Sequence, residues 1–252
     1  FKWLEEKAFR RGLRNTNFFR KVVRRAAYRR ANGDPEKVHK LALESLNEHI
    51  YVINEVKNDF LFPDLNVEVA GHDTIPFGNA AGLDKNGDAL YPLSKLFGYL
   101  KPGTVVVSAR PGNTGLRVAV DEKAENIFNA QGFPSKGLEY FIENLQDYYH
   151  KNGRKPLIPS VCGLPESAEN LRRAYEELET LLTRINPYAD GFEWNPFSPN
   201  TAALVALRTP AEFKRSAQLI KSIIGKKPAY VKMGVYKTEE QKKEWLALAK
   251  AF

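Results

Sequence analysis

Residues 157–194 read LIPSVCGLPESAENLRRAYEELETLLTRINPYADGFEW. A short apolar run is followed by a polar loop, by apolar residues at helical spacing, and by a second short apolar run. This succession is typical of two parallel strands joined by a helix. The stretch therefore predicts a β-α-β unit, and it favours the α/β class of fold.

The same alternation extends from about residue 75 to the carboxyl end of the sequence. We expect strands at 78–83, 104–109, 157–162, 191–194 and 229–233, and helices at 88–96, 136–150, 167–185, 210–224 and 238–252. In a sequence of 252 residues this pattern predicts a (β/α)8 TIM barrel of which about five βα units are present. We therefore expect the sequence to be part of a longer chain, with a helical extension at 1–66 and an incomplete barrel domain at 67–252.

The amino-terminal extension carries the positive charge of the chain. Its first 31 residues hold eleven Lys and Arg residues against two Glu, and the whole sequence has a net charge of +8. Residues Phe19, Val22, Val23, Ala26 and Ala27 recur at helical spacing opposite a face of arginines. Such a helix is typical of a segment lying in a membrane interface, but a helix packed on its own domain shows the same pattern. A basic arm would also suit nucleic acid, although the apolar stripe favours lipid.

Other features of the sequence exclude several kinds of site. A further helix should begin at Pro35 with Asp34 as its N-cap, and no run of eighteen apolar residues occurs. The single cysteine, Cys162, excludes an internal disulfide, favours a reducing compartment, and is expected to be a buried strand residue. The four histidines lie far apart in sequence, so we expect no metal site.

Polar and glycine-rich stretches follow the expected strands. Residues 80–87 follow the first strand, a long connection containing residues 129–133 follows the second, and residues 195–201 follow the fourth. Lys232 lies in the otherwise apolar fifth strand. Because the active groups of a barrel gather at the carboxyl ends of its strands, these stretches are the candidate site.

These stretches resemble the dihydroorotate dehydrogenase family of FMN-dependent barrel enzymes. Residues 78–87 (GNAAGLDKNG) are similar to its first flavin-contacting loop, and Asn129 with Gly132 and Phe133 is similar to its orotate-contacting stretch. Residues 198–201 (SPNT) resemble the catalytic loop, and Lys232 resembles the flavin-side lysine. Residues 34–39 (DPEKVH) resemble the helix opening of the membrane-associated, quinone-reducing class. The sequence is identified as a member of that family because five motifs occur in the family's order.

The resemblance implies oxidation of dihydroorotate to orotate in pyrimidine (UMP) biosynthesis, with FMN as hydride acceptor and quinone as final acceptor. Ser198 would be the catalytic base. The implied substrate contacts are Lys85, Asn129, Gly132, Phe133 and Asn200, and the implied FMN contacts are Ala81, Gly82, Ser108, Asn195 and Lys232. The class also implies a peripheral protein of the cell or mitochondrial inner membrane, seated through residues 1–31, with no nucleic acid as partner.

Several positions differ from the family pattern, among them Ala130-Gln131 and Pro196-Phe197. Val161 stands where the family offers an asparagine, Val107-Ser108 stands where Gly-Thr is usual, and Ala130 replaces a larger residue. Two alternatives therefore stay open. The chain would be another FMN-dependent barrel oxidoreductase that acts on a different cyclic amide, or a non-catalytic, degenerate barrel whose arm binds lipid or nucleic acid.

Overall fold

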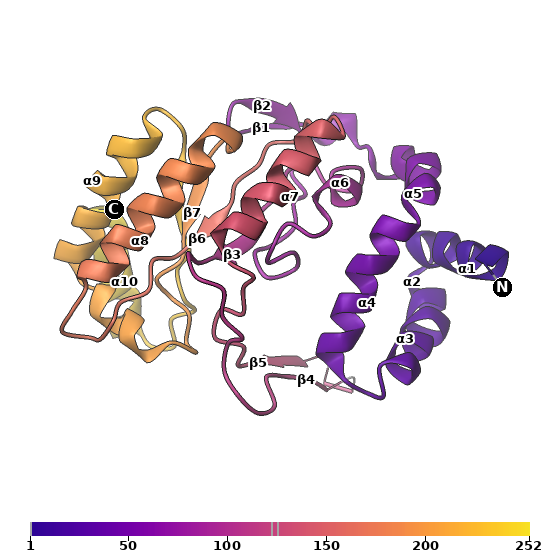
Figure 1. Cartoon of the computed structure of the whole chain (residues 1–252), viewed down its shortest axis with the longest axis horizontal. Coiled ribbons are helices and arrows are strands. Elements are labelled where there is room, and N and C mark those ends of the chain that lie inside the picture. The colour runs from indigo at the N-terminus through magenta and orange to yellow at the C-terminus, as the bar shows by residue number, and fades with distance from the viewer. Residues whose placement is uncertain (1, 122, 125) are drawn as a thin grey trace.

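A parallel sheet with helices packed against it forms the body of the computed structural model, which describes residues 2–121, 123–124 and 126–252 (Figure 1). Phe1, the first residue of the predicted arm, lies outside them. Within the described residues the strand order is β3 (Gly103–Val105), β6 (Ser160–Val161), β7 (Phe192–Trp194) and β8 (Ala229–Val231). The pairs are parallel, with Val161 opposite Trp194 and Trp194 opposite Val231. The predicted α/β class is therefore confirmed.

The helices that cover this sheet follow the predicted alternation. They are α7 (Leu138–His150), α8 (Arg172–Ile185), α9 (Pro210–Ile224) and α10 (Glu239–Ala251). α9 has the predicted bounds because Thr209 caps it, Pro210 supplies a helical φ at its first position, and Gly225 ends it. The buried faces of α8 and α9 pack with the sheet around Trp194, Phe213 and Leu181, each nearly inaccessible to solvent.

The first predicted strand, 78–83, is reduced to one bridge between Gly78 and Tyr99. The side chain of Asn79 takes the place of the ladder: its Oδ1 accepts from the Lys101 N–H at 3.0 Å, and its Nδ2 donates to the Lys101 carbonyl at 3.2 Å. Beyond it, Gly82 has a φ of +106°. A chain that turns there cannot continue as a strand, so residues 80–87 form a loop. The helix predicted at 88–96 is correspondingly short, α6 (Leu90–Leu93).

The amino-terminal extension is helical, as predicted. It comprises α1 (Lys2–Arg14), α2 (Thr16–Phe18), a π-helical turn (Phe19–Val23), α3 (Arg24–Arg30), α4 (Pro35–Glu48) and α5 (Ile50–Val56). Asp34 caps α4 by accepting from the Glu36 and Lys37 N–H groups, which confirms the predicted N-cap. α1 packs against α5 and the residues on either side of it. There Arg14 donates to Asp59 at 2.6 Å, and the Phe9 ring stacks on His49. No helix among the described residues has the length and apolar character that crossing a membrane requires.

Two antiparallel hairpins complete the fold, and the sequence pattern predicted neither. β1 (Val67–Val69) pairs with β2 (His72–Thr74), after 3-10 turns at Lys57–Phe60 and Pro63–Leu65. β4 (Val118–Asp121) pairs with β5 (Asn126–Asn129) inside the long connection between β3 and α7. Further 3-10 turns lie at Asn186–Tyr188 and Ala202–Leu207. Figure 1 shows the β4–β5 hairpin reaching from the sheet toward α4.

Candidate functional site

All predicted site residues except Ser108 gather around one cavity of about 320 Å³ beyond the carboxyl ends of the parallel strands. Separate loops supply its lining, and both Lys85 and Lys232 border it. No Asp or Glu is among the described residues that line it. Its electrostatic field therefore favours an anionic ligand. The lining residues are Ala81, Gly82, Lys85, Gly103, Thr104, Asn129, Gln131, Gly132, Phe133, Pro134, Asn195, Phe197, Ser198, Pro199, Asn200 and Lys232.

The loop that carries Lys85 is fixed at its base by Asp84. This carboxylate is fully buried and accepts from the N–H groups of Asp88 at 2.8 Å and Ala89 at 2.9 Å. Burial raises its pKa to about 6, and the two N–H groups oppose that rise. Lys85 then donates from Nζ to the Gly82 carbonyl at 3.1 Å. Burial lowers the pKa of Lys85, although the negative charges of Glu36 and Asp84 oppose this change.

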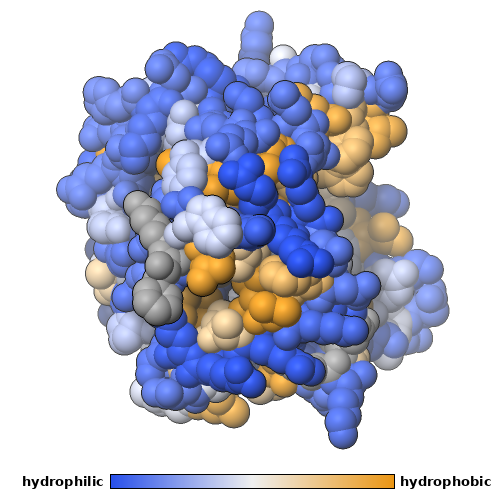
Figure 2. All heavy atoms as spheres, turned by 90° about the vertical axis from the view of Figure 1, so that its right-hand side faces the viewer, coloured by the Kyte–Doolittle hydropathy of each residue, from blue (hydrophilic) through white to orange (hydrophobic). Residues whose placement is uncertain are grey.

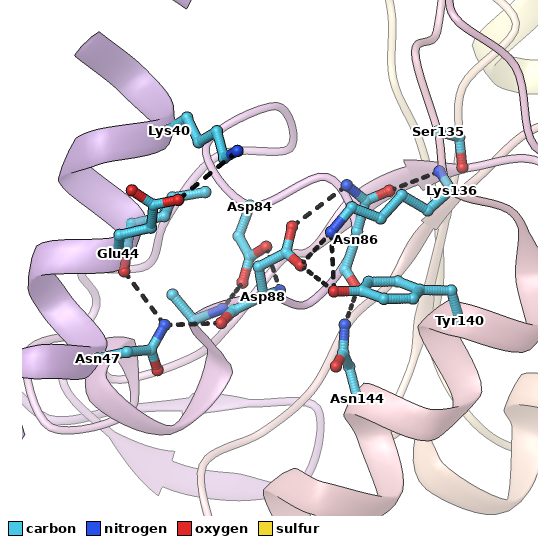
Figure 3. A network of polar contacts seen from close by, with 12 residues as sticks. Lys40, Glu44, Asn47, Asp84, Asn86, Asp88, Ser135, Lys136, Tyr140 and Asn144 are labelled. Atoms are coloured by element: carbon cyan, nitrogen blue, oxygen red, sulfur yellow. Dashed lines mark hydrogen bonds and ion pairs between the residues drawn. The ribbon is translucent and has the colours of Figure 1, made fainter. Parts of the chain in front are cut away.

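A polar network holds the far side of the same loop (Figure 3). Asp88 accepts from Lys136 at 3.0 Å, from Tyr140 at 2.7 Å and from Asn86 at 3.2 Å. Burial alone would raise the pKa of Asp88, but these three donors lower it. From α4, Asn47 donates to the Asp88 carbonyl at 2.8 Å. The loop that carries Lys85 is thus tied to both α4 and α7.

Ser198 lies on the loop that follows β7, and Arg208 holds this loop. The Arg208 guanidinium donates to the carbonyls of Pro196 at 3.0 Å and Ser198 at 3.2 Å, and it lies over the Phe197 ring. The Ser198 hydroxyl accepts weakly from the Asn200 N–H at 3.4 Å. Arg208 was not predicted from the sequence, and no motif marks it. Its contact with the loop depends on the turn at Ala202–Leu207, which brings it back toward Pro196.

Asn195 and Thr104 form a buried pair at the floor of the cavity. Asn195 donates from Nδ2 to Thr104 Oγ1 at 2.8 Å, and Thr104 Oγ1 lies 3.0 Å from Ser160 Oγ. The Asn195 Oδ1 is buried without a partner among the described residues. Ser108, which was predicted to contact the cofactor, is exposed and does not line the cavity. Thr104 lines the cavity instead of Ser108. The strand that carries it, β3, ends at Val105, four residues before the predicted end.

The two asparagines expected to bind substrate are joined across the cavity mouth. Asn200 donates from Nδ2 to the Asn129 carbonyl at 3.1 Å, and Asn113 donates to the Asn200 carbonyl at 3.2 Å. Gly132 and Phe133 follow in the lining, both with positive φ. A side chain at 132 would overlap the amide of Asn113, so glycine is required there.

A second cavity, of about 520 Å³, lies between α4 and these loops. Arg117 makes a bidentate ion pair with Glu36 of α4, at 2.9 Å for each contact, and Gln131 donates to the same carboxylate at 2.8 Å. His39 lies 2.6 Å from the Leu83 carbonyl. Lys85 lines both cavities. The extension is therefore built into the candidate site.

Val161, one of the positions that differ from the family pattern, lies within the parallel sheet. Val161 is fully buried on β6 and does not line the 320 Å³ cavity. Cys162, the next residue, is also fully buried, and burial raises the pKa of its thiol, so its predicted burial is confirmed. It lies just beyond the strand, because β6 covers only Ser160–Val161 of the predicted strand 157–162. Neither side chain takes part in the candidate site as the structure has it.

The fold and the comparisons identify the class and then the family. The four parallel strands, with the site at their carboxyl ends, form an open sheet that corresponds to part of a β/α barrel. Among solved structures, DHODH from Eimeria tenella in complex with ferulenol matches with a TM-score of 0.69 at 23% identity, over 86% of this chain and 64% of that one, and the ligand-free form matches with 0.66. The family model described as dihydroorotate dehydrogenase matches residues 64–252. The chain belongs to the dihydroorotate dehydrogenase family.

Two bacterial relatives of this chain are named dihydroorotate dehydrogenase (quinone). The protein of Psychrobacter cryohalolentis is 32% identical over 71% of this chain and 51% of its own length. That of Glaesserella parasuis is 30% identical over 83% of this chain and 64% of its own length. The chain spans about half to two thirds of the length of these relatives.

Proposed function

We propose that this protein oxidises dihydroorotate to orotate in pyrimidine biosynthesis, with FMN as hydride acceptor and quinone as final electron acceptor. The observation that carries the proposal is the 320 Å³ cavity, in which two lysines, three asparagines and Ser198 converge, with no carboxylate among the lining residues that the structure describes. Dihydroorotate carries a carboxylate and ring amides, which such a set of donors and acceptors complements. Membership of the family supports the same reaction.

The residues at the cavity floor fit a flavin. The Asn195 Oδ1, which has no partner among the described residues, is a buried acceptor that a ring N–H would satisfy. Ala81 and Gly82 also line the cavity, and because they have little or no side chain they leave room for a flat ring. Bound FMN would supply the hydride acceptor of the reaction. Lys232, whose side chain borders the cavity, would place a positive charge where the reduced ring is negative.

Each remaining site residue has a role under this proposal. Ser198 would take the proton from the ring carbon next to the one that gives up hydride. Lys85 would bind the substrate carboxylate, while Asn129 and Asn200 would bind its ring amides, with Gly132 and Phe133 closing the pocket beside them. Arg208, which holds the backbone of the Ser198 loop, is assigned the role of a positioning residue.

Flavin reduction tests the proposal directly. On anaerobic mixing of the FMN-loaded protein with dihydroorotate, we expect the yellow absorbance of the oxidised flavin to bleach in a single exponential phase. A saturated cyclic amide without a carboxylate serves as the control, because it offers nothing for Lys85 to bind. Bleaching by that amide and not by dihydroorotate would move the choice to another FMN-dependent oxidoreductase. No bleaching by either would indicate a non-catalytic barrel.

We further propose that residues 1–66 seat the barrel domain, residues 67–252, on a membrane surface from which quinone enters. The family match that begins at residue 64 supports this division. Apolar side chains are exposed on the amino-terminal helices, including Trp3 at 64% and both Phe19 and Val22 at 45%. Figure 2 views the molecule from this side and shows apolar residues gathered near the middle of a largely hydrophilic face. The 520 Å³ cavity under α4 would connect that side with the candidate flavin site.

Vesicle binding distinguishes membrane seating from a helix that merely covers its own domain. We expect the protein to bind anionic vesicles, with an affinity that salt weakens but does not abolish, because charge attraction is screened and apolar burial is not. The double substitution Phe19→Ser with Val22→Ser should weaken binding at least tenfold. The control is Val235→Ser with Leu246→Ser, which removes apolar side chains that are at least as exposed, near the carboxyl end. Equal binding by the two double variants, or tighter binding to duplex nucleic acid at the same salt, would contradict the proposal.

A further inference from the structure

A third cavity, of about 450 Å³, lies at the opposite end of the sheet from Ser198. Segments that precede the parallel strands form it: residues 94–97 lead to β3, and residues 152–156 lead to β6. The turn at Lys57–Phe60 and strand β2 close its other side. The residues of the candidate catalytic site do not border this cavity, so its properties do not follow from the proposed reaction.

Most of the charged side chains that line this third cavity are positive. Lys57, Lys95, Arg154 and Lys155 line it, and Asp73 is the one carboxylate among its described lining residues. Asp73 accepts from Asn66 at 2.9 Å and contacts none of the four cations. Arg154 donates to the Gly153 carbonyl and to Asn152 Oδ1, and Lys95 lies over the Tyr91 ring. Within the described chain none of the four forms an ion pair, unlike Lys101, Arg117 and Lys136 elsewhere on the protein.

Burial and the crowding of positive charges disfavour the charged form of Lys155. Its side chain is half-buried, and burial together with the charge of Lys95 lowers its pKa. His72, which also lines the cavity, lies 3.1 Å from the Asp190 carboxylate. Two half-buried ammonium groups that repel each other destabilise the cavity as it stands. An anion bound between them would remove that repulsion.

The remaining lining combines apolar side chains with the uncharged polar residues Asn58, Thr74, Ser94 and Asn152. Phe60, Ile75, Phe97 and Pro156 line the cavity beside the cations. A volume of 450 Å³ lies in the range of small-molecule sites, which combine apolar walls with a few charged groups. Lysine and arginine together are the usual binders of phosphate oxygens.

We propose that this cavity binds the phosphate group of a small phosphate ester, held by Lys95 and Lys155 with Arg154 and Lys57 at the rim. The site is separate from the proposed catalytic centre and independent of whether dihydroorotate is the substrate. A phosphate ester has two sources, a soluble metabolite or a lipid headgroup, and the chemistry of recognition is the same for both.

Inorganic pyrophosphate is the probe for this site, with calorimetry of the purified protein at moderate salt as the measurement. We expect saturable binding at one site, weakened at least tenfold by Lys95→Gln with Lys155→Gln. The matched control is Lys221→Gln with Lys226→Gln, which removes the same charge from exposed positions outside the cavity, and it should change the affinity less than twofold. Pyrophosphate should also raise the unfolding temperature of the parent and control proteins but not of the cavity variant. That second measurement shows that the cavity variant folds, because its own transition must remain cooperative.

The source of the phosphate is decided by a second pair of titrations. Soluble nucleoside diphosphate that binds more tightly than pyrophosphate, through the apolar wall, would assign a metabolite. Vesicles of phosphatidic acid that lose affinity in the cavity variant but not in the control, with no binding of the nucleotide, would assign a lipid headgroup. Equal weakening of pyrophosphate binding in both double variants would show non-specific attraction to a basic protein, and it would overturn the proposal.

Discussion

Ser198→Ala is expected to slow the reduction of bound flavin by dihydroorotate about a hundredfold or more, with the affinity for dihydroorotate nearly unchanged. A positioned general base is typically worth a factor of 10² to 10⁴ in rate. The change removes one hydroxyl and leaves the backbone that Arg208 holds, so the loop should keep its conformation. The measurement is stopped-flow bleaching of the flavin over a range of dihydroorotate concentrations, which separates the limiting rate from the apparent binding constant.

Two further variants serve as comparisons for Ser198→Ala in this experiment. Ser222→Ala alters a serine on α9, whose hydroxyl donates within its own helix, and should leave the bleaching rate unchanged. Lys85→Ala should instead weaken binding as well as rate, because it would hold the substrate carboxylate in the ground state and the transition state alike. Bleaching by Ser198→Ala at the parent rate would remove Ser198 from the mechanism without affecting the assignment of the cavity.

Trp194→Ala should lower the free energy of unfolding by about 3–5 kcal/mol, the usual range for a fully buried large aromatic side chain. Trp194 is 1% exposed and lies on β7, in the middle of the parallel sheet. Its ring contacts Phe213 edge-on at 4.9 Å and stacks with Phe252 at 6.0 Å between centroids. Removing the ring leaves a cavity between the sheet and α9, and the side chains of the adjacent strands cannot fill it because the ladder hydrogen bonds hold those strands in place.

Urea unfolding followed by circular dichroism measures this loss. Trp3→Ala is the matched control, since Trp3 is 64% exposed and its removal should change the free energy of unfolding by less than about 0.5 kcal/mol. A loss below about 1 kcal/mol in Trp194→Ala would contradict the close packing of this ring against Phe213 and Phe252. Circular dichroism is preferred over tryptophan fluorescence because the substitution removes one of only three tryptophans.

Local signals in the sequence were enough to predict the class of fold and most of the helices, although the helix expected at 88–96 is only Leu90–Leu93. The bounds of α9 could be predicted because a cap, a proline and a glycine act within a few residues of each helix end. The strand expected at 78–83 could not be corrected in the same way. Whether a side-chain amide such as that of Asn79 replaces the hydrogen bonds of a strand depends on a neighbour 22 residues away.

In the candidate site, too, residues within sequence motifs could be predicted, whereas residues placed by contacts across the fold could not. Motif resemblance predicted Lys85, Asn129, Ser198, Asn200 and Lys232, and the structure brings all five to one cavity. It did not predict Thr104, since residues 104–107 are four consecutive β-formers whose register along the strand no period reveals. Arg208 and the pair between Glu36 and Arg117 depend on contacts across the fold, the latter 81 residues apart in sequence.

Lys85 forms part of the wall between the cavity under α4 and the cavity of the candidate site. A single ammonium group can neutralise an anion on one side or on the other, but not on both at once. Anions bound in the two cavities would therefore share this charge, and each would raise the apparent dissociation constant of the other. The effect would reach a limit as the second cavity fills, because the two molecules are coupled through one charge without displacing each other.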